Sequence, residues 1–88
     1  MKLIIAILRD EDSDNIIETL IKNEFRVTRI ASTGGFLRKG MTTMMIGIED
    51  EKVDEVFQIM RDNCAPVADN GIRRATMFVL NVDRFTQV

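Results

Sequence analysis

The fold is decided by residues 25–47, which read FRVTRIASTGGFLRKGMTTMMIG. The two ends of this stretch, residues 25–32 and 42–48, are rich in β-branched and apolar residues, as half-buried β-strands are. Between them, Gly34 and Gly35 mark a tight connection. The stretch therefore predicts a β-hairpin with a glycine-bearing loop.

The loop has a composition that suits a ligand. The glycine pair lets the backbone approach an anion closely and direct successive N–H groups at it. Two large apolar residues at a hairpin tip cannot both be buried, so a base, a neighbouring subunit or a partner has to cover them. Cations stand close by in the sequence. The apolar pair is Phe36 and Leu37, and the cations are Arg26, Arg29, Arg38 and Lys39. Together they favour a nucleotide-type site, although an ordinary hairpin turn with a basic tip fits the same residues.

The whole chain predicts a single domain over residues 1–88, with 45% apolar and 30% charged residues. A chain this short buries a modest share of its surface and often oligomerises. The net charge of −2 gives no general attraction to DNA, RNA or anionic membranes. With no His and one Cys, neither structural zinc nor an internal disulfide is expected. Residues 3–8 are too short to span a membrane and lack a signal-peptide pattern, so a cytoplasmic location is expected.

Further elements extend outward from the hairpin. A continuous apolar run predicts a strand over residues 2–8, and helical spacing follows as far as about residue 23. A second helix is predicted from Asp50, as its N-cap, to about residue 63, and a last strand over residues 75–82. The order β-α-β-β-α-β is that of an α+β, ferredoxin-like sandwich.

Both faces of the predicted sheet are apolar. In the first strand, Ile4 and Leu8 would lie on one side, and Leu3, Ile5 and Ile7 on the other. Two helices cover one face of a four-stranded sheet, so the second face needs another cover. A further subunit is the expected one.

An enzymatic function is less favoured by the sequence than a binding function. Without His, a Ser or Cys nucleophile lacks its usual base. The segment after the first strand is acidic and would repel phosphate. It is expected to be a solvated helix N-terminus rather than a cation site. An RNA-recognition module needs exposed aromatics on its central strands, and the first strand has none. The acidic residues are Asp10, Glu11, Asp12 and Asp14.

Several stretches match those of a known family. They are residues 1–7 (MKLIIAI), 25–28 (FRVT), 31–38 (ASTGGFLR), 53–56 (VDEV) and 75–80 (ATMFVL), together with Gly40, Thr42, Thr43 and Gly47. In these residues the chain resembles the PII-like cyclic-di-AMP receptors of Gram-positive and related bacteria. The resemblance implies a homotrimer, nucleotide sites in the clefts between subunits, an unidentified protein target and neither catalysis nor a cofactor.

The resemblance also implies a pocket. In the family's pattern, backbone N–H groups of the glycine loop hold phosphate, and a cation adds charge. Apolar side chains cover adenine faces, and polar groups read the base edges. The matching positions are Arg26, Thr28, Gly35, Phe36, Leu37, Gly47, Phe78 and Gln87.

Two positions depart from the family's pattern. Glu24 and Met41 replace asparagines, which both donate and accept hydrogen bonds. The connection over residues 64–73 is also shorter than the long loop of the family. Two hypotheses follow. The first is a trimeric signalling protein that binds an adenine nucleotide, with cyclic-di-AMP as the candidate. The second is a trimeric scaffold that has lost the ligand and contacts a protein through Phe36 and Leu37.

Overall fold

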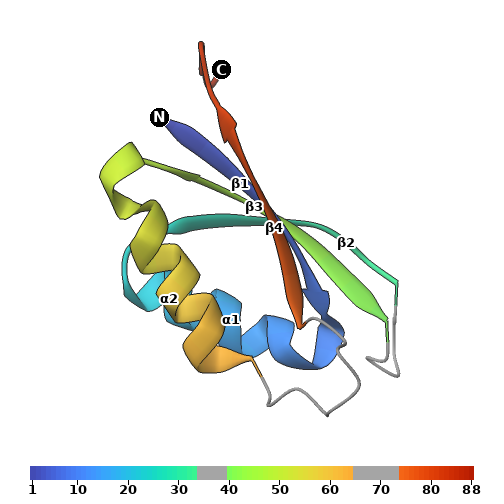
Figure 1. The fold of residues 1–88 in the computed structure, drawn as a ribbon. Coiled ribbons are helices and arrows are strands. Elements are labelled where there is room, and N and C mark those ends of the chain that lie inside the picture. The colour runs from blue at the N-terminus through green and yellow to red at the C-terminus, as the bar shows by residue number, and fades with distance from the viewer. Residues whose placement is uncertain (34–39, 65–73) are drawn as a thin grey trace.

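The computed structural model describes residues 1–33, 40–64 and 74–88. The elements are β1 (Lys2–Arg9), α1 (Asp10–Lys22), β2 (Arg26–Ser32), β3 (Met41–Ile48), the short 3₁₀ turn η2 (Asp50–Lys52), α2 (Val53–Asn63) and β4 (Ala75–Asn81). The order confirms the ferredoxin-like α+β prediction (Figure 1).

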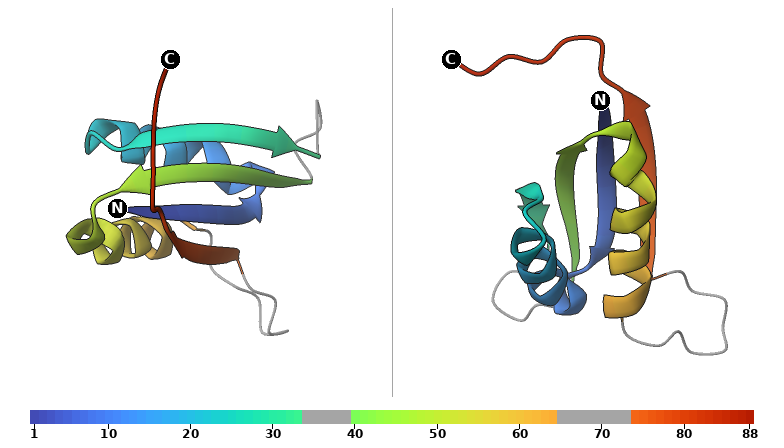
Figure 2. Two further views of the ribbon diagram at one scale, coloured as in Figure 1. Left: turned by 90° about the horizontal axis from the view of Figure 1, so that it is seen from above. Right: turned by 90° about the vertical axis from the view of Figure 1, so that its left-hand side faces the viewer.

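The four strands form one antiparallel sheet in the order β2-β3-β1-β4. Both helices lie on the same face of this sheet, as the two views in Figure 2 show. We refer to the helix-covered side as the inner face and to the opposite side as the open face. A register shift between Arg29 and Ala31 places one extra residue in β2 and forms a β-bulge. Before and after this bulge, the side chains of β2 alternate between the two faces of the sheet.

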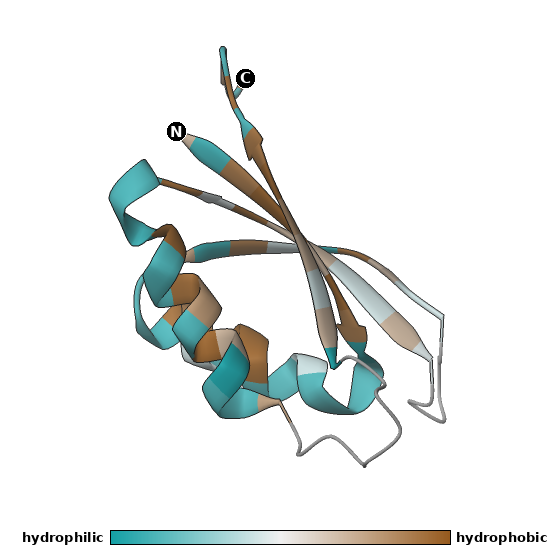
Figure 3. Ribbon diagram, viewed as in Figure 1, coloured by the Kyte–Doolittle hydropathy of each residue, from teal (hydrophilic) through white to brown (hydrophobic). Residues whose placement is uncertain are grey.

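The core fills the space between the inner face and the helices. It is apolar, as period-2 strands and period-3.6 helices predict. Its buried members from the sheet are Ile4, Ala6, Leu8, Met44, Ile46 and Ile48, and from the helices and the turn after α1 they are Ile16, Leu20, Phe25, Val56 and Met60. Figure 3 shows the same division, with hydrophobic residues on the strands and hydrophilic residues on the outward sides of the helices.

Helix α1 ends in a Schellman motif. Phe25 N–H donates to Leu20 O at 3.0 Å, and Glu24 N–H donates to Ile21 O at 2.9 Å. The motif places Glu24 at the position that usually holds glycine or asparagine, because that residue adopts a left-handed backbone. Glu24 has a φ of 67°, so it adopts the left-handed conformation although its side chain is long. Its carboxylate therefore stands at a turn that directly precedes β2.

The second helix begins differently from the prediction, and the first helix follows its strand without a break. β1 passes directly into α1, whose N-cap is Arg9, and Asp10 already belongs to the helix. The predicted cap Asp50 lies in η2 instead, and α2 starts at Val53. Asp50 pairs with the N-terminal amino group at 3.1 Å. That partner is far away in the sequence, so the pairing could not be read from local spacing.

Candidate functional site

The open face carries the predicted site residues that belong to strands. The register aligns Arg26 with Gly47, and Gly47 with Leu3 of β1. It also aligns Thr28 with Met45. Across the whole sheet, two neighbouring rows result: Arg26–Gly47–Leu3–Leu80 and Thr28–Met45–Ile5–Phe78. Four of the predicted residues therefore share one surface, although β2 and β4 are the two edges of the sheet.

This surface is apolar in its middle and polar at the β2 edge. Phe78 is 52% exposed and Leu80 is 45% exposed, whereas Leu3, Ile5 and Met45 are half-buried. Arg26 and Thr28 are exposed at the β2 edge. An apolar platform with a cation and a hydroxyl at its edge can stack a base and hold a phosphate.

Gly47 leaves room for the first residue of the chain. A Cβ built at Gly47 would lie 3.3 Å from Cε of Met1. Met1 therefore packs over the backbone of β3 at the Arg26 end of the open face. Because the Met side chain is flexible, it can move aside and free this backbone for a ligand.

The strand ends that flank the glycine-bearing loop lie at the opposite end of the hairpin. Gly35, Phe36 and Leu37 fall outside the described residues, but the residues that flank them are defined. Arg26 starts β2, and Ser32 ends it. At about 3.3 Å per residue, these two positions are on the order of 20 Å apart. Within one chain, the length of β2 therefore separates Arg26 from the residues that flank the loop.

Glu24 and Met41 show the same separation. Glu24 precedes the Arg26 end of β2, and Met41 starts β3 at the loop end, on the open face. Both side chains are exposed. The two departures from the family's pattern therefore act at different ends of the hairpin.

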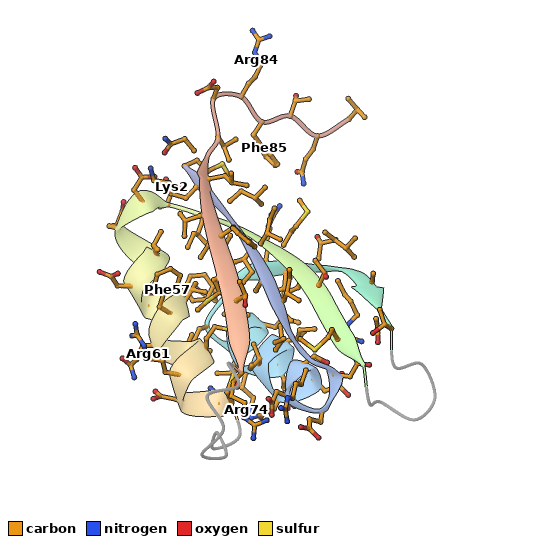
Figure 4. The ribbon with its side chains drawn as sticks, turned by 45° about the vertical axis from the view of Figure 1, so that its right-hand side comes forward. Lys2, Phe57, Arg61, Arg74, Arg84 and Phe85 are labelled. Carbon is orange, nitrogen blue, oxygen red and sulfur yellow. The ribbon has the colours of Figure 1, made fainter. Side chains whose placement is uncertain are left out.

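Gln87 lies in the C-terminal segment that follows β4. The six residues from Asp83 to Val88 are all exposed. Phe85 is 60% exposed, and it projects beyond the end of the sheet, away from both helices (Figure 4). Gln87 lies after the end of β4, so the strand register aligns it with neither row on the open face.

Arg29 differs from the expectation that it adds charge near the loop. Its guanidinium donates to Asp14 Oδ1 at 2.8 Å and to Ser13 Oγ at 3.3 Å. Its register partner Met44 is a buried core residue, so Arg29 faces the helices. The cation belongs to the contact between β2 and α1 rather than to the open face.

The acidic start of α1 also differs from the expected solvated terminus. Asp10 and Asp12 are buried, whereas Glu11 and Asp14 are exposed. Asp10 accepts hydrogen bonds from three groups of the β2–β3 hairpin. Sequence reasoning missed this residue. The usable signal was its position immediately after the apolar run that forms β1.

Cys64 remains a poor nucleophile. Burial raises the pKa of its thiol, the nearby Asp12 carboxylate adds to the rise, and Arg74 partly opposes it. The thiol is partly buried. Among the described ranges, no three His, Cys, Asp or Glu side chains are grouped so that they could hold a metal ion.

Comparison with known proteins settles the family. A family model described as cyclic-di-AMP receptor matches residues 1–70. The chain belongs to the cyclic-di-AMP receptor family. A solved structure of a functionally unknown protein from Pediococcus pentosaceus is similar over 99% of this chain and 96% of its own, with 36% identity and a TM-score of 0.78. This likeness supports the ferredoxin-like fold, and the family match confirms the predicted resemblance.

Within the part of the chain that the structure describes, no helix is long and apolar enough to cross a membrane.

Proposed function

We propose that this member of the cyclic-di-AMP receptor family is a trimeric signalling protein that binds an adenine dinucleotide, cyclic-di-AMP first, between subunits. The observation that carries the proposal is the pair of rows on the open face. They align Arg26, Thr28, Gly47 and Phe78, the strand residues that the family's pocket would use. This surface also presents exposed apolar side chains that a second subunit and a base would cover.

The length of the hairpin supports a site that is shared between subunits. The Arg26 end and the loop end of one chain are too far apart for a single small ligand to join. In a trimer, the open face of one subunit would meet the glycine-bearing loop and the C-terminal segment of another. Gly35, Phe36, Leu37 and Gln87 would then complete the pocket.

We further propose that the protein binds without turnover. The chain contains no His, and the pKa of its one thiol is raised rather than lowered. Binding would instead be read by a protein target. Incubation with cyclic-di-AMP or ATP should therefore leave both nucleotides intact.

A thermal shift screen against a nucleotide panel tests the proposal. A ligand that binds the folded state raises the midpoint with its concentration. Cyclic-di-AMP should produce the largest rise. A panel in which no nucleotide shifts the midpoint would favour the scaffold hypothesis instead, and Glu24 is the observation that supports this second candidate. Its carboxylate stands next to β2, where it would repel phosphate.

The two departures from the family's pattern give a sharper test. At about 4 Å, like charges cost about 1 kcal/mol in water and about 4 kcal/mol near a protein surface. Glu24→Asn should therefore strengthen cyclic-di-AMP binding by roughly tenfold to a thousandfold, with a gain that shrinks in salt. Met41→Asn should strengthen the binding free energy by a further, smaller amount of about 0.5–1.5 kcal/mol, which does not depend on salt. Calorimetry on both single variants and the double variant measures these two effects. Tight binding by the wild type, unchanged in all three, would place both residues outside the pocket.

A further inference from the structure

Asp10 is a buried carboxyl group at the junction of β1 and α1. Its side chain is 0% exposed, although it begins a helix whose next residue, Glu11, is exposed. A carboxyl group is costly to bury unless hydrogen bonds replace its lost water. The partners of Asp10 therefore show what its burial achieves.

Three hydrogen-bond donors to this carboxyl group come from the two strand ends that flank residues 34–39. Oδ1 accepts a hydrogen bond from Ser32 Oγ at 2.9 Å and another from Thr42 Oγ1. Oδ2 accepts one from Gly40 N–H at 3.2 Å. The backbone N–H of Asp10 donates to Gly40 O at 3.0 Å. One residue of α1 is thus bonded to the end of β2, to the residue before β3 and to β3 itself. In Figure 1 the beginning of α1 lies beside the start of β3.

The two strand ends are also bonded to each other. Thr33 N–H donates to Met41 O at 2.9 Å, and Met41 N–H donates to Thr33 Oγ1 at 2.8 Å. These bonds set the spacing of the strand ends. The bonds to Asp10 set their position relative to the helix layer, and hence to the rest of the domain.

We propose that Asp10 is a positioning residue that fixes both stems of the glycine-bearing loop and so raises affinity for the nucleotide without touching it. The stems are Ser32–Thr33 and Gly40–Thr42. The affinity part of this proposal rests on the proposed function. Binding groups that are held in place before the ligand arrives lose less conformational freedom on binding. A carboxylate suits this task because it accepts several hydrogen bonds at once, and charged acceptors make stronger bonds than neutral ones.

Amide hydrogen exchange in the ligand-free protein tests the stems directly. Asp10→Asn keeps the shape of the side chain but replaces one acceptor oxygen with a donor. Ser32→Ala removes one donor at the exposed end of the network and leaves the core intact. Asp54→Asn is the matched control, because it makes the same change in the first turn of α2, at an exposed residue. In both test variants, the amides of Gly40 and Met41 should exchange about tenfold faster or more, whereas those of Ile4 and Ile46 keep their rates. The control should change neither pair.

Calorimetry with cyclic-di-AMP, at a temperature where every variant is folded, tests the link to binding. Asp10→Asn should weaken binding by about tenfold, Ser32→Ala by less, and Asp54→Asn not at all. Three results would overturn the proposal: unchanged exchange at the stems, equally faster exchange in the core, or loosened stems with unchanged affinity. If the wild type binds no cyclic-di-AMP, the proposed function fails and so does the affinity part. The exchange rates still decide whether Asp10 fixes the stems.

Discussion

The two faces of one sheet have similar side chains but different surroundings. Neighbouring residues of β1 show the contrast. Ile4 on the inner face is 0% exposed and packs in the core, whereas Ile5 on the open face is only half-buried. The helices cover the centre of the inner face, whereas Val79, which is in register with Ile4 at the β4 edge, is 41% exposed. The open face is almost as apolar, yet the described part of the chain supplies nothing that covers Phe78 or Leu80.

This contrast supports the proposal that a further molecule covers the open face. A sheet with one solvated face normally alternates apolar and polar residues. Here β1 is apolar on both sides, so the open face is better explained as a surface that another molecule covers. Four of the predicted pocket residues lie on that surface, so the proposed function connects assembly with ligand binding.

Replacing Ile4 or Ile5 with alanine should give the largest difference in stability between a change on the inner face and one on the open face. Ile4→Ala should lower the free energy of unfolding by about 2–5 kcal/mol at any protein concentration, because it leaves a cavity in a closed core. Ile5→Ala should act mainly through association, so that its effect on the thermal midpoint depends on protein concentration. Thermal melts over a hundredfold range of concentration measure both. Equal, concentration-independent losses would show that the open face is not an interface.

Aromatic residues on the two sides of the sheet should separate binding from folding. Phe78→Ala on the open face should weaken cyclic-di-AMP binding by about 1–3 kcal/mol, the scale of losing a stacked base. Phe36→Ala should do the same with little change in stability. Phe57→Ala is the control, because Phe57 packs against the core from α2 (Figure 4). It should lower stability and leave affinity unchanged. Calorimetry measures the affinity of the three variants, and denaturant unfolding measures their stability. If Phe57→Ala lost as much affinity as Phe78→Ala, binding and folding would not depend on separate aromatic residues.

Glu24→Asn should stabilise the protein by about 0.5–1 kcal/mol even without ligand. The left-handed backbone of Glu24 is strained for most side chains, whereas asparagine tolerates it. Urea unfolding of the free protein measures the gain, with Glu18→Gln on the exposed side of α1 as a control that should have little effect. An unchanged or lower unfolding free energy would mean that the turn carries no such strain.

The pair between Asp50 and the N-terminus should give the smallest effect, which depends on pH. The hydrogen bond from the N-terminal amino group lowers the pKa of the Asp50 carboxyl below its ordinary value, with help from the charge of Lys2. A folded pKa below the unfolded one means that this stabilisation is present above the unfolded pKa and is lost as the pH falls through the folded pKa. Between pH 6 and pH 3, stability should fall slightly more steeply in the wild type than in Asp50→Asn. Parallel curves would show that the pair contributes nothing measurable.

The sequence predicted the strands and helices well because burial is periodic. Alternation placed Ile4 and Ile5 on opposite faces, and helical spacing predicted helix α1. The family's motif then indicated a nucleotide surface. Local sequence patterns could not predict which distant residue forms a hydrogen bond or ion pair with a given polar side chain. Asp10 looked like a solvated helix start, and only its contacts with Ser32 and Gly40 show a second role. Likewise, neither the pairing of Asp50 nor the inward direction of Arg29 could be derived before the strand register was known.

Native mass spectrometry with cyclic-di-AMP tests the central claim most directly, because it reports assembly and ligand binding in one spectrum. The account predicts trimers of the 10.1 kDa chain that take up as many as three ligands, with no ligand on monomers. Replacing Leu80 with Asp on the open face should yield free monomers without ligand. A wild-type spectrum of monomers alone, or of monomers that carry the nucleotide, would contradict a site shared between open faces and neighbouring subunits.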